Sequence, residues 1–216
     1  MRNKIWTAAA LLAATLTLSA CTSGEPAEKP ASAVTEVTPD DKAATVLDTP
    51  FEKPDLVLTG TDGKEFDLRE QTQGRPTLIY FGYTNCPDVC PLTMNNIAVA
   101  KKQLPQEQQD ELRVVFVTTD PERDTAEELG SWLKGIDTDI VGLTGDFATI
   151  QAGARTLGIT IEEPVKEKDG TVVSTHGTQV VAFSPKTDEG YVLYGEETTV
   201  DDYTADLPKL IKGENP

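Results

Sequence analysis

The period of the hydrophobic positions changes from one stretch of the chain to the next. Residues 77–83 and 112–118 are almost continuously apolar or aromatic, as is typical of strands that are buried on both faces of a sheet. Between them, apolar residues recur at helical spacing from Met94 to Leu104. A strand, a helix and a second strand in this order predict a parallel sheet with a crossover helix.

Shorter patterns predict further elements around this centre. Thr125 and Glu128 have the spacing of a capping box, which predicts the start of a helix that runs through Leu133. The turn sequence Thr61-Asp62-Gly63 separates two short apolar runs, as in a hairpin. The other expected elements are strands at 56–58, 65–68 and 140–143 and a helix over 147–157.

The last part of the chain has a different character. Short strands at 171–173, 179–183 and 191–194 are separated by tight polar turns, which predicts antiparallel pairing. A final helix is expected from residue 201 or 202 to 211. We therefore predict an α/β fold: a mixed sheet flanked by helices, with an antiparallel C-terminal half.

The first twenty residues have the pattern of a secretory signal peptide. Arg2 and Lys4 precede an apolar stretch over 5–18, which is too short to span a membrane comfortably. The sequence Leu18-Ser19-Ala20-Cys21 resembles the bacterial lipobox. This resemblance implies cleavage before Cys21 and a diacylglycerol on its sulfur, so that the protein is extracytoplasmic and anchored to the membrane by lipidated Cys21.

Residues 21–54 have the composition of a tether. They contain five of the 14 prolines and one aromatic residue, Phe51, so they bury too little apolar surface to offset the entropy of ordering. We therefore predict a lipoprotein signal peptide at 1–20, a lipid-anchored disordered tether at 21–54 and one folded domain at 55–216.

Charge and cysteine content argue against several classes of protein. The chain carries 19 Lys and Arg against 36 Asp and Glu, a formal net charge of −17. Since binding a polyanion requires basic patches, we expect no nucleic-acid partner. Three cysteines in 216 residues also exclude a disulfide-dense scaffold.

Cys86 and Cys90 lie directly after the first buried strand, where open α/β sheets bind their ligands. At this spacing, side chains share one face of a helix, so both sulfurs can reach one ion. We expect Cys90 to cap the following helix and Pro91 to be its first residue. The positive end of that helix would favour the thiolate form of both cysteines.

His176 is the only histidine, and it is expected in a loop or bulge before the strand at 179–183. Beside two exposed thiols, it is a candidate third metal ligand. Two thiolates and one imidazole suit Cu(I), Cu(II) or Zn(II). Zinc normally takes a fourth ligand, which Asp88 would supply only if its loop turned inward, so copper is favoured.

Carboxylates follow the second buried strand. The simplest interpretation is that Asp120 ends this strand and that Asp124 or Thr125 caps the next helix. Asp120 also lies at the predicted metal-binding edge and is a candidate for influencing the site. The acidic residues between 188 and 202 are expected to form a solvated face, which a basic partner could contact.

Residues 80–91, YFGYTNCPDVCP, resemble the signature of the Sco/SenC family, and residues 117–125, VTTDPERDT, and His176 follow in that family's order. The resemblance covers about residues 50–212. It implies a thioredoxin-like fold in which Cys86, Cys90 and His176 bind copper. It also implies a role in assembling the dinuclear copper (CuA) centre in subunit II of cytochrome c oxidase.

Two classes of function remain open. The first is a copper metallochaperone without turnover, which receives copper and passes it to subunit II; another copper donor protein is the candidate source. The second is a thiol–disulfide oxidoreductase in which Cys86 attacks and Cys90 resolves, keeping the CuA-site cysteines reduced. Three residues between the cysteines fit chelation better than redox chemistry. A peroxiredoxin-like activity is disfavoured, because no arginine lies in the Cys86–Cys90 loop.

Overall fold

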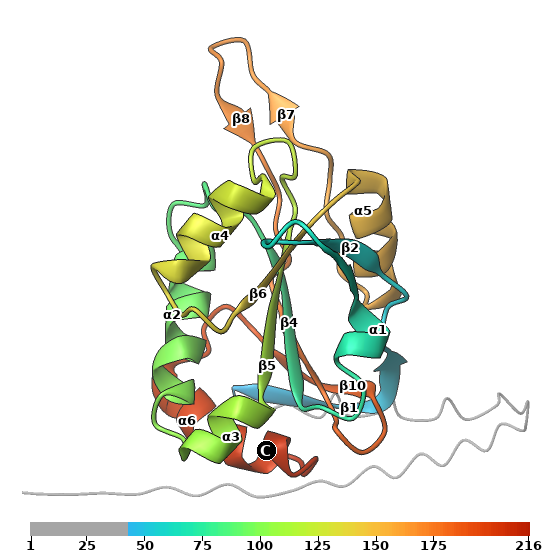
Figure 1. Ribbon diagram of the computed structural model, residues 1–216, viewed down its shortest axis with the longest axis vertical. Coiled ribbons are helices and arrows are strands. Elements are labelled where there is room, and N and C mark those ends of the chain that lie inside the picture. Colours follow the sequence, from blue (N-terminus) through green and yellow to red (C-terminus); the bar gives the residue numbers. More distant parts are fainter. Residues whose placement is uncertain (1–42) are drawn as a thin grey trace, which may run out of the picture. The chain divides into compact units, whose positions relative to one another are not determined.

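The computed structural model describes residues 43–216, and its central feature is an eight-stranded sheet (Figure 1). The strands of this sheet are Ala44–Glu52 (β1), Val57–Gly60 (β2), Glu65–Asp67 (β3), Thr77–Gly82 (β4), Arg113–Thr118 (β5), Val141–Thr144 (β6), Val180–Phe183 (β9) and Glu189–Tyr194 (β10). Their order across the sheet is β1-β10-β9-β4-β5-β6-β2-β3. Val165–Lys166 (β7) and Val172–Val173 (β8) form a separate hairpin.

The centre of the sheet is parallel and one side of it is antiparallel. β4 pairs in parallel with β5, and β5 with β6. β9 runs antiparallel to β4, β10 antiparallel to β9, and β1 antiparallel to β10. This topology confirms the predicted mixed sheet with an antiparallel C-terminal half.

Six helices occur within residues 43–216: Leu68–Gln71 (α1), Val89–Lys101 (α2), Gln106–Glu111 (α3), Ala126–Lys134 (α4), Phe147–Thr156 (α5) and Val200–Ile211 (α6). Helices α2, α4 and α6 cover one face of the sheet and α5 covers the other (Figure 1). The strands alternate accordingly: Tyr80 of β4 packs on the first face, and Phe81 on the second. Burial on both faces explains why β4 and β5 read as continuous apolar runs.

The folded part begins earlier than we predicted. Residues 44–52, assigned to the tether, form β1 and pair with β10 at the edge of the sheet. Most side chains of β1 are exposed or half-buried, because an edge strand is held through main-chain hydrogen bonds. The composition of β1 therefore resembles that of a linker, although its backbone is part of the sheet.

The helix starts follow the expected capping chemistry with small differences. Thr125 caps α4 and accepts the N–H of Glu128. Helix α6 begins at Val200 after a capping box formed by Thr199 and Asp202. The short helices α1 and α3 and the strand β7 were not predicted.

The predicted signal peptide (1–20), Cys21 and the tether up to residue 42 lie outside the described residues. Within residues 43–216, no helix combines the length and the apolar character needed to cross a bilayer.

Candidate functional site

The loop that carries the cysteines joins the carboxyl end of β4 to α2. Asp88 caps α2 by accepting the N–H of Val89 at 2.7 Å. The helix therefore begins at Val89, and the expectation that Cys90 is the cap and Pro91 the first residue is wrong. Pro91 is the third helical residue, where a missing N–H leaves no helical carbonyl without its partner. Since Asp88 is exposed and engaged as a cap, it does not act as the inward-turned ligand that zinc would require.

The two cysteines are free and lie next to each other. The backbone N–H of Cys90 donates to Sγ of Cys86 at 3.4 Å. The Tyr80 hydroxyl donates to Sγ of Cys90 at 3.6 Å, from the strand beneath. Cys86 is 6% exposed and Cys90 is fully buried, so the expectation of two exposed thiols is wrong.

Burial determines the protonation of Cys90. It raises the pKa of this thiol to about 12, and hydrogen bonds from the Tyr83 backbone and the Tyr80 hydroxyl lower it by less. The prediction that the helix N-terminus favours a thiolate at both positions therefore fails for Cys90. In the metal-free protein Cys90 is a neutral thiol, and it must lose a proton to bind a metal ion.

His176 lies in the loop between β8 and β9, at the same edge of the sheet. The main chain on both sides of it is fixed. The Thr175 carbonyl accepts the Thr119 hydroxyl at 2.5 Å, and the Gly177 N–H donates to the Phe81 carbonyl at 2.8 Å. The half-buried imidazole lies 6.1 Å from the ring of Tyr83, centroid to centroid.

The orientation of the imidazole leaves one nitrogen for a metal. Nδ1 lies 2.8 Å from the carbonyl oxygen of Gly177. When Nδ1 carries the proton, it donates to this carbonyl, and the lone pair resides on Nε2. A backbone carbonyl is a usual orienting partner for a metal-binding histidine.

The structure brings the cysteines together and places the histidine loop at the same edge, but it does not close a three-ligand site. Within residues 43–216, no group of three or more His, Cys, Asp or Glu side chains is arranged to hold a metal ion. Completing the predicted set therefore requires the imidazole to move towards the sulfurs.

Both carboxylates after β5 have structural partners. Asp124 accepts the N–H of Thr84 at 2.9 Å and the hydroxyl of Thr118 at 2.6 Å, so it holds the base of the cysteine loop instead of capping α4. Asp120 is 1% exposed and pairs with Arg123 and Ser174 through Oδ2. Thr84, Arg123 and Ser174 also contribute to this edge, and none of them was predicted to do so.

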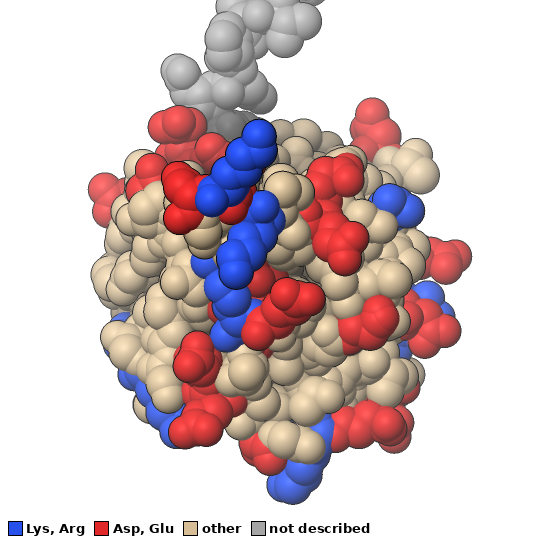
Figure 2. Space-filling model, turned by 90° about the horizontal axis from the view of Figure 1, so that it is seen from above, with Lys and Arg blue, Asp and Glu red and all other residues tan. Residues whose placement is uncertain are grey.

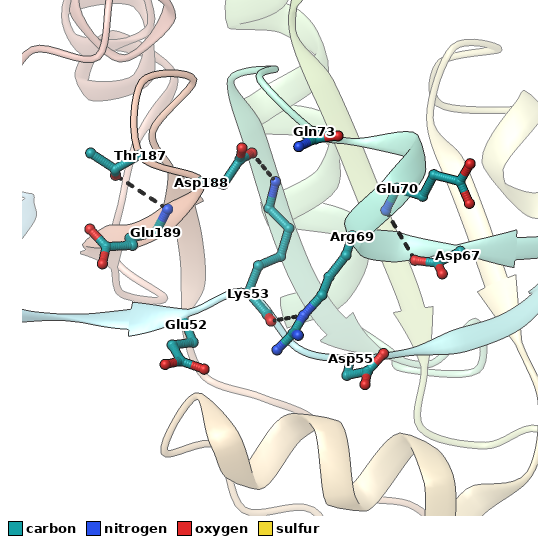
Figure 3. A pocket seen from close by; sticks show the side chains of 10 residues that line it. All are labelled: Glu52, Lys53, Asp55, Asp67, Arg69, Glu70, Gln73, Thr187, Asp188 and Glu189. Carbon is teal, nitrogen blue, oxygen red and sulfur yellow. Dashed lines mark hydrogen bonds and ion pairs between the residues drawn. The ribbon is translucent and has the colours of Figure 1, made fainter.

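A separate hollow of about 540 Å³ lies near the opposite, amino end of β4 (Figure 3). Lys53 is buried there and donates to the Thr72 carbonyl at 3.0 Å and to Oδ1 of Asp188 at 2.7 Å. Asp188 was expected on a solvated acidic face, yet it joins three segments of the chain, because it also accepts the N–H of Gly74. The polar residues that line this hollow stabilise the fold, and no cysteine or histidine is among them.

The end of the molecule that carries the β7–β8 hairpin has mixed charge. Seen from this end, Lys and Arg side chains form a short row with Asp and Glu on both sides (Figure 2). The net charge of −17 is therefore not concentrated into one acidic patch on this face.

A family model described as SCO1/SenC matches residues 43–212. A protein of Stutzerimonas stutzeri described as a putative copper-binding protein is 33% identical over 144 residues, which are 66% of this chain and 70% of that protein. The chain spans less than half the length of several further curated relatives, all described as SCO proteins.

Two solved structures extend the comparison to the fold. The structure of Bradyrhizobium japonicum ScoI with copper bound has a TM-score of 0.63 and 29% identity, covering 75% of this chain and 98% of that one. BsSco, described as a member of the Sco family of cytochrome c oxidase assembly proteins, has a TM-score of 0.59 and 22% identity, covering 77% and 97%. These similarities confirm the predicted thioredoxin-like fold.

Proposed function

Because the chain belongs to the SCO1/SenC family, we propose that it binds copper through Cys86, Cys90 and His176 and serves in cytochrome c oxidase assembly. The observation that carries this proposal is the pair of adjacent free thiols at the carboxyl end of β4, with the only histidine fixed at the same edge. The copper-bound ScoI structure supports the choice of metal.

The donor set suits copper as transported cargo. Two thiolates favour Cu(I), and the added imidazole nitrogen makes Cu(II) tenable, so both oxidation states can be held. Copper coordination requires Cys90 to release its proton and His176 to turn Nε2 towards the sulfurs. Three ligands leave the ion accessible to the ligands of an acceptor, so that copper can pass by stepwise exchange.

The acceptor in this proposal is the CuA centre of cytochrome c oxidase subunit II, and the copper comes from a separate donor protein. We further propose that residues 1–20 are removed and that Cys21 is lipidated. Residues 21–42 would then tether the domain to the outer side of the membrane. Radiolabelled fatty acid that is incorporated into the wild-type protein but not into a Cys21→Ser variant would support the anchor.

The test of copper binding is an anaerobic titration of the reduced protein. We expect one tight equivalent of copper, which is lost in Cys86→Ser and weakened in His176→Ala. Cys21→Ser is the control for loss of a cysteine outside the proposed site, since it leaves Cys86, Cys90 and His176 in place. Absence of stoichiometric binding by the wild-type protein would overturn the proposal.

One observation favours a second candidate, a thiol–disulfide oxidoreductase acting on the oxidase cysteines. Cys86 is slightly exposed and Cys90 is fully buried behind it, as expected of an attacking thiol and a resolving thiol. Incubating the reduced protein with an oxidised CuA domain distinguishes the two candidates. Reduction of the CuA disulfide by the wild-type protein but not by Cys86→Ser would favour the redox function, and no reduction would exclude it.

A further inference from the structure

The segment from Thr118 to Asp124 contacts both loops of the candidate site. On one side, Asp124 holds Thr84 of the cysteine loop, as described above. On the other side, Asp120 receives the hydroxyl of Ser174, two residues before His176, at 2.7 Å. Thr119 joins the end of β4 to the histidine loop, since its N–H donates to the Gly82 carbonyl and its hydroxyl to the Thr175 carbonyl.

Ser174, Asp120 and Arg123 form a closed triangle of hydrogen bonds. Arg123 Nε donates to Oδ2 of Asp120 at 2.6 Å, and its terminal nitrogen donates to the Ser174 hydroxyl at 3.1 Å. Ser174 is 8% exposed and Asp120 is 1% exposed. Hydrogen bonds to a buried charged group are among the stronger ones in proteins, so this triangle fixes Ser174 firmly.

We propose that Ser174 and Arg123 are positioning residues that act through Asp120 to hold His176 at the cysteine loop. The inference rests on the proposed copper-binding function. The side chain of Ser174 is held by Asp120, and the main chain is held at Thr175 and Gly177, so the backbone of His176 has little freedom. Copper capture then requires rotation of the imidazole without folding of the whole loop, and the entropy of ordering the third ligand is largely removed before copper arrives.

The test is a double-mutant cycle measured as copper affinity. Ser174→Ala should weaken copper binding about tenfold in the wild-type background. In the His176→Ala background the same change should have no further effect, because the lost residue acts only through the histidine. An equal loss in both backgrounds, or no loss in either, would overturn the proposal.

Two further variants separate positioning from general damage to the fold. Thr178→Ala is the matched control, since Thr178 lies as far from His176 in sequence as Ser174 does and is exposed; its copper affinity should be unchanged. Ser174→Thr retains the hydroxyl and should restore most of the affinity. Arg123→Gln should reproduce the effect of Ser174→Ala. A Thr178→Ala loss as large as that of Ser174→Ala would also count against the proposal.

A metal-free measurement keeps this inference separate from the copper proposal. In the apo protein, Ser174→Ala should increase amide hydrogen exchange at residues 175–178 at least tenfold while leaving exchange in β4 and β5 unchanged. If the wild-type protein bound no copper but showed this local increase, the copper proposal would fail and the positioning contact would stand. Unchanged exchange would overturn the positioning role itself.

Discussion

Polar groups are buried at both ends of β4, but the two ends differ in how many of these groups have hydrogen-bond or ion-pair partners. At the amino end, the ammonium of Lys53 has both a carbonyl and a carboxylate partner, and Asp188 is bound from two segments. At the carboxyl end, the two sulfurs have only weak donors near them, and Oδ1 of the buried Asp120 has no partner within the described residues.

This difference separates a structural site from a functional one. A buried polar group whose partners are all present contributes to stability and has nothing left for a ligand. Buried groups whose lone pairs have no partner lower the stability of the fold, but those lone pairs are available to coordinate a metal ion. Changes at the amino end should therefore affect unfolding, and changes at the carboxyl end should affect copper.

The largest effect on stability is expected from Lys53→Met. Removing the ammonium leaves Asp188 without its charged partner, and because the Asp188 side chain is 34% exposed we expect a loss of about 3 kcal/mol, near the low end for buried pairs. Urea unfolding measures the loss. Copper affinity should not change.

Lys64→Met is the control for this variant. It also breaks a Lys–Asp pair, but the side chains of Lys64 and Asp62 are 81% and 60% exposed, so the cost should stay below about 1 kcal/mol. Similar losses in the two variants would show that burial of the Lys53–Asp188 pair adds nothing to stability, and the amino end of β4 would then not be the structural site described here.

A second effect concerns pH. Since Cys90 has a pKa raised to about 12, it binds copper only after losing a proton at any pH near neutrality. Copper affinity should therefore rise about tenfold per pH unit from this group alone, or about 100-fold between pH 6 and pH 8. Competition with a chelator of known pH dependence measures the slope. A flat profile would show that Cys90 does not bind as a thiolate, whereas Lys53→Met should keep the wild-type slope.

The sequence predicts most of the elements because burial leaves a pattern in it. The strands β4 and β5 are buried on both faces and appear as apolar runs, and the caps of α4 and α6 appear as Thr followed by an acid three residues later. The edge strand β1 has no such pattern, because main-chain hydrogen bonds hold it.

The chemistry of the site is only partly visible in the sequence. The spacing of Cys86 and Cys90 predicts their adjacency, because it depends on one local helix start. Burial of Cys90 depends on packing against Tyr80 of another element. Local sequence indicates that the helix N-terminus lowers the pKa of this thiol, but it does not indicate the desolvation that raises that pKa. The contacts of Ser174 and Arg123 join residues about 50 positions apart and could not be predicted from spacing.

A smaller effect is expected from Gly82→Ala, next to the sulfurs. A Cβ on Gly82 would lie 2.8 Å from a ring carbon of Tyr80 and 2.9 Å from Sγ of Cys90, closer than atoms can approach. We expect a loss of about 2 kcal/mol in stability and weaker copper binding, since Cys90 must shift. Gly195→Ala is the control, because nothing lies within 4 Å of its added Cβ. Equal behaviour of the two variants would contradict close packing at the cysteines.

The smallest effect is expected from Tyr80→Phe, which removes one hydroxyl from beneath Cys90. This hydroxyl lowers the pKa of Cys90 by donating to its sulfur, so its loss raises that pKa further and makes proton release costlier. Copper affinity at neutral pH should fall a few-fold, about 1 kcal/mol or less. Tyr203→Phe is the matched control: its buried hydroxyl has no partner within residues 43–216, so removing it should leave copper affinity unchanged and stability equal or higher. If Tyr80→Phe instead bound copper more tightly, competition between the hydroxyl and the metal for the sulfur lone pair would outweigh the effect of the hydroxyl on the pKa of Cys90, and the expected loss would be wrong.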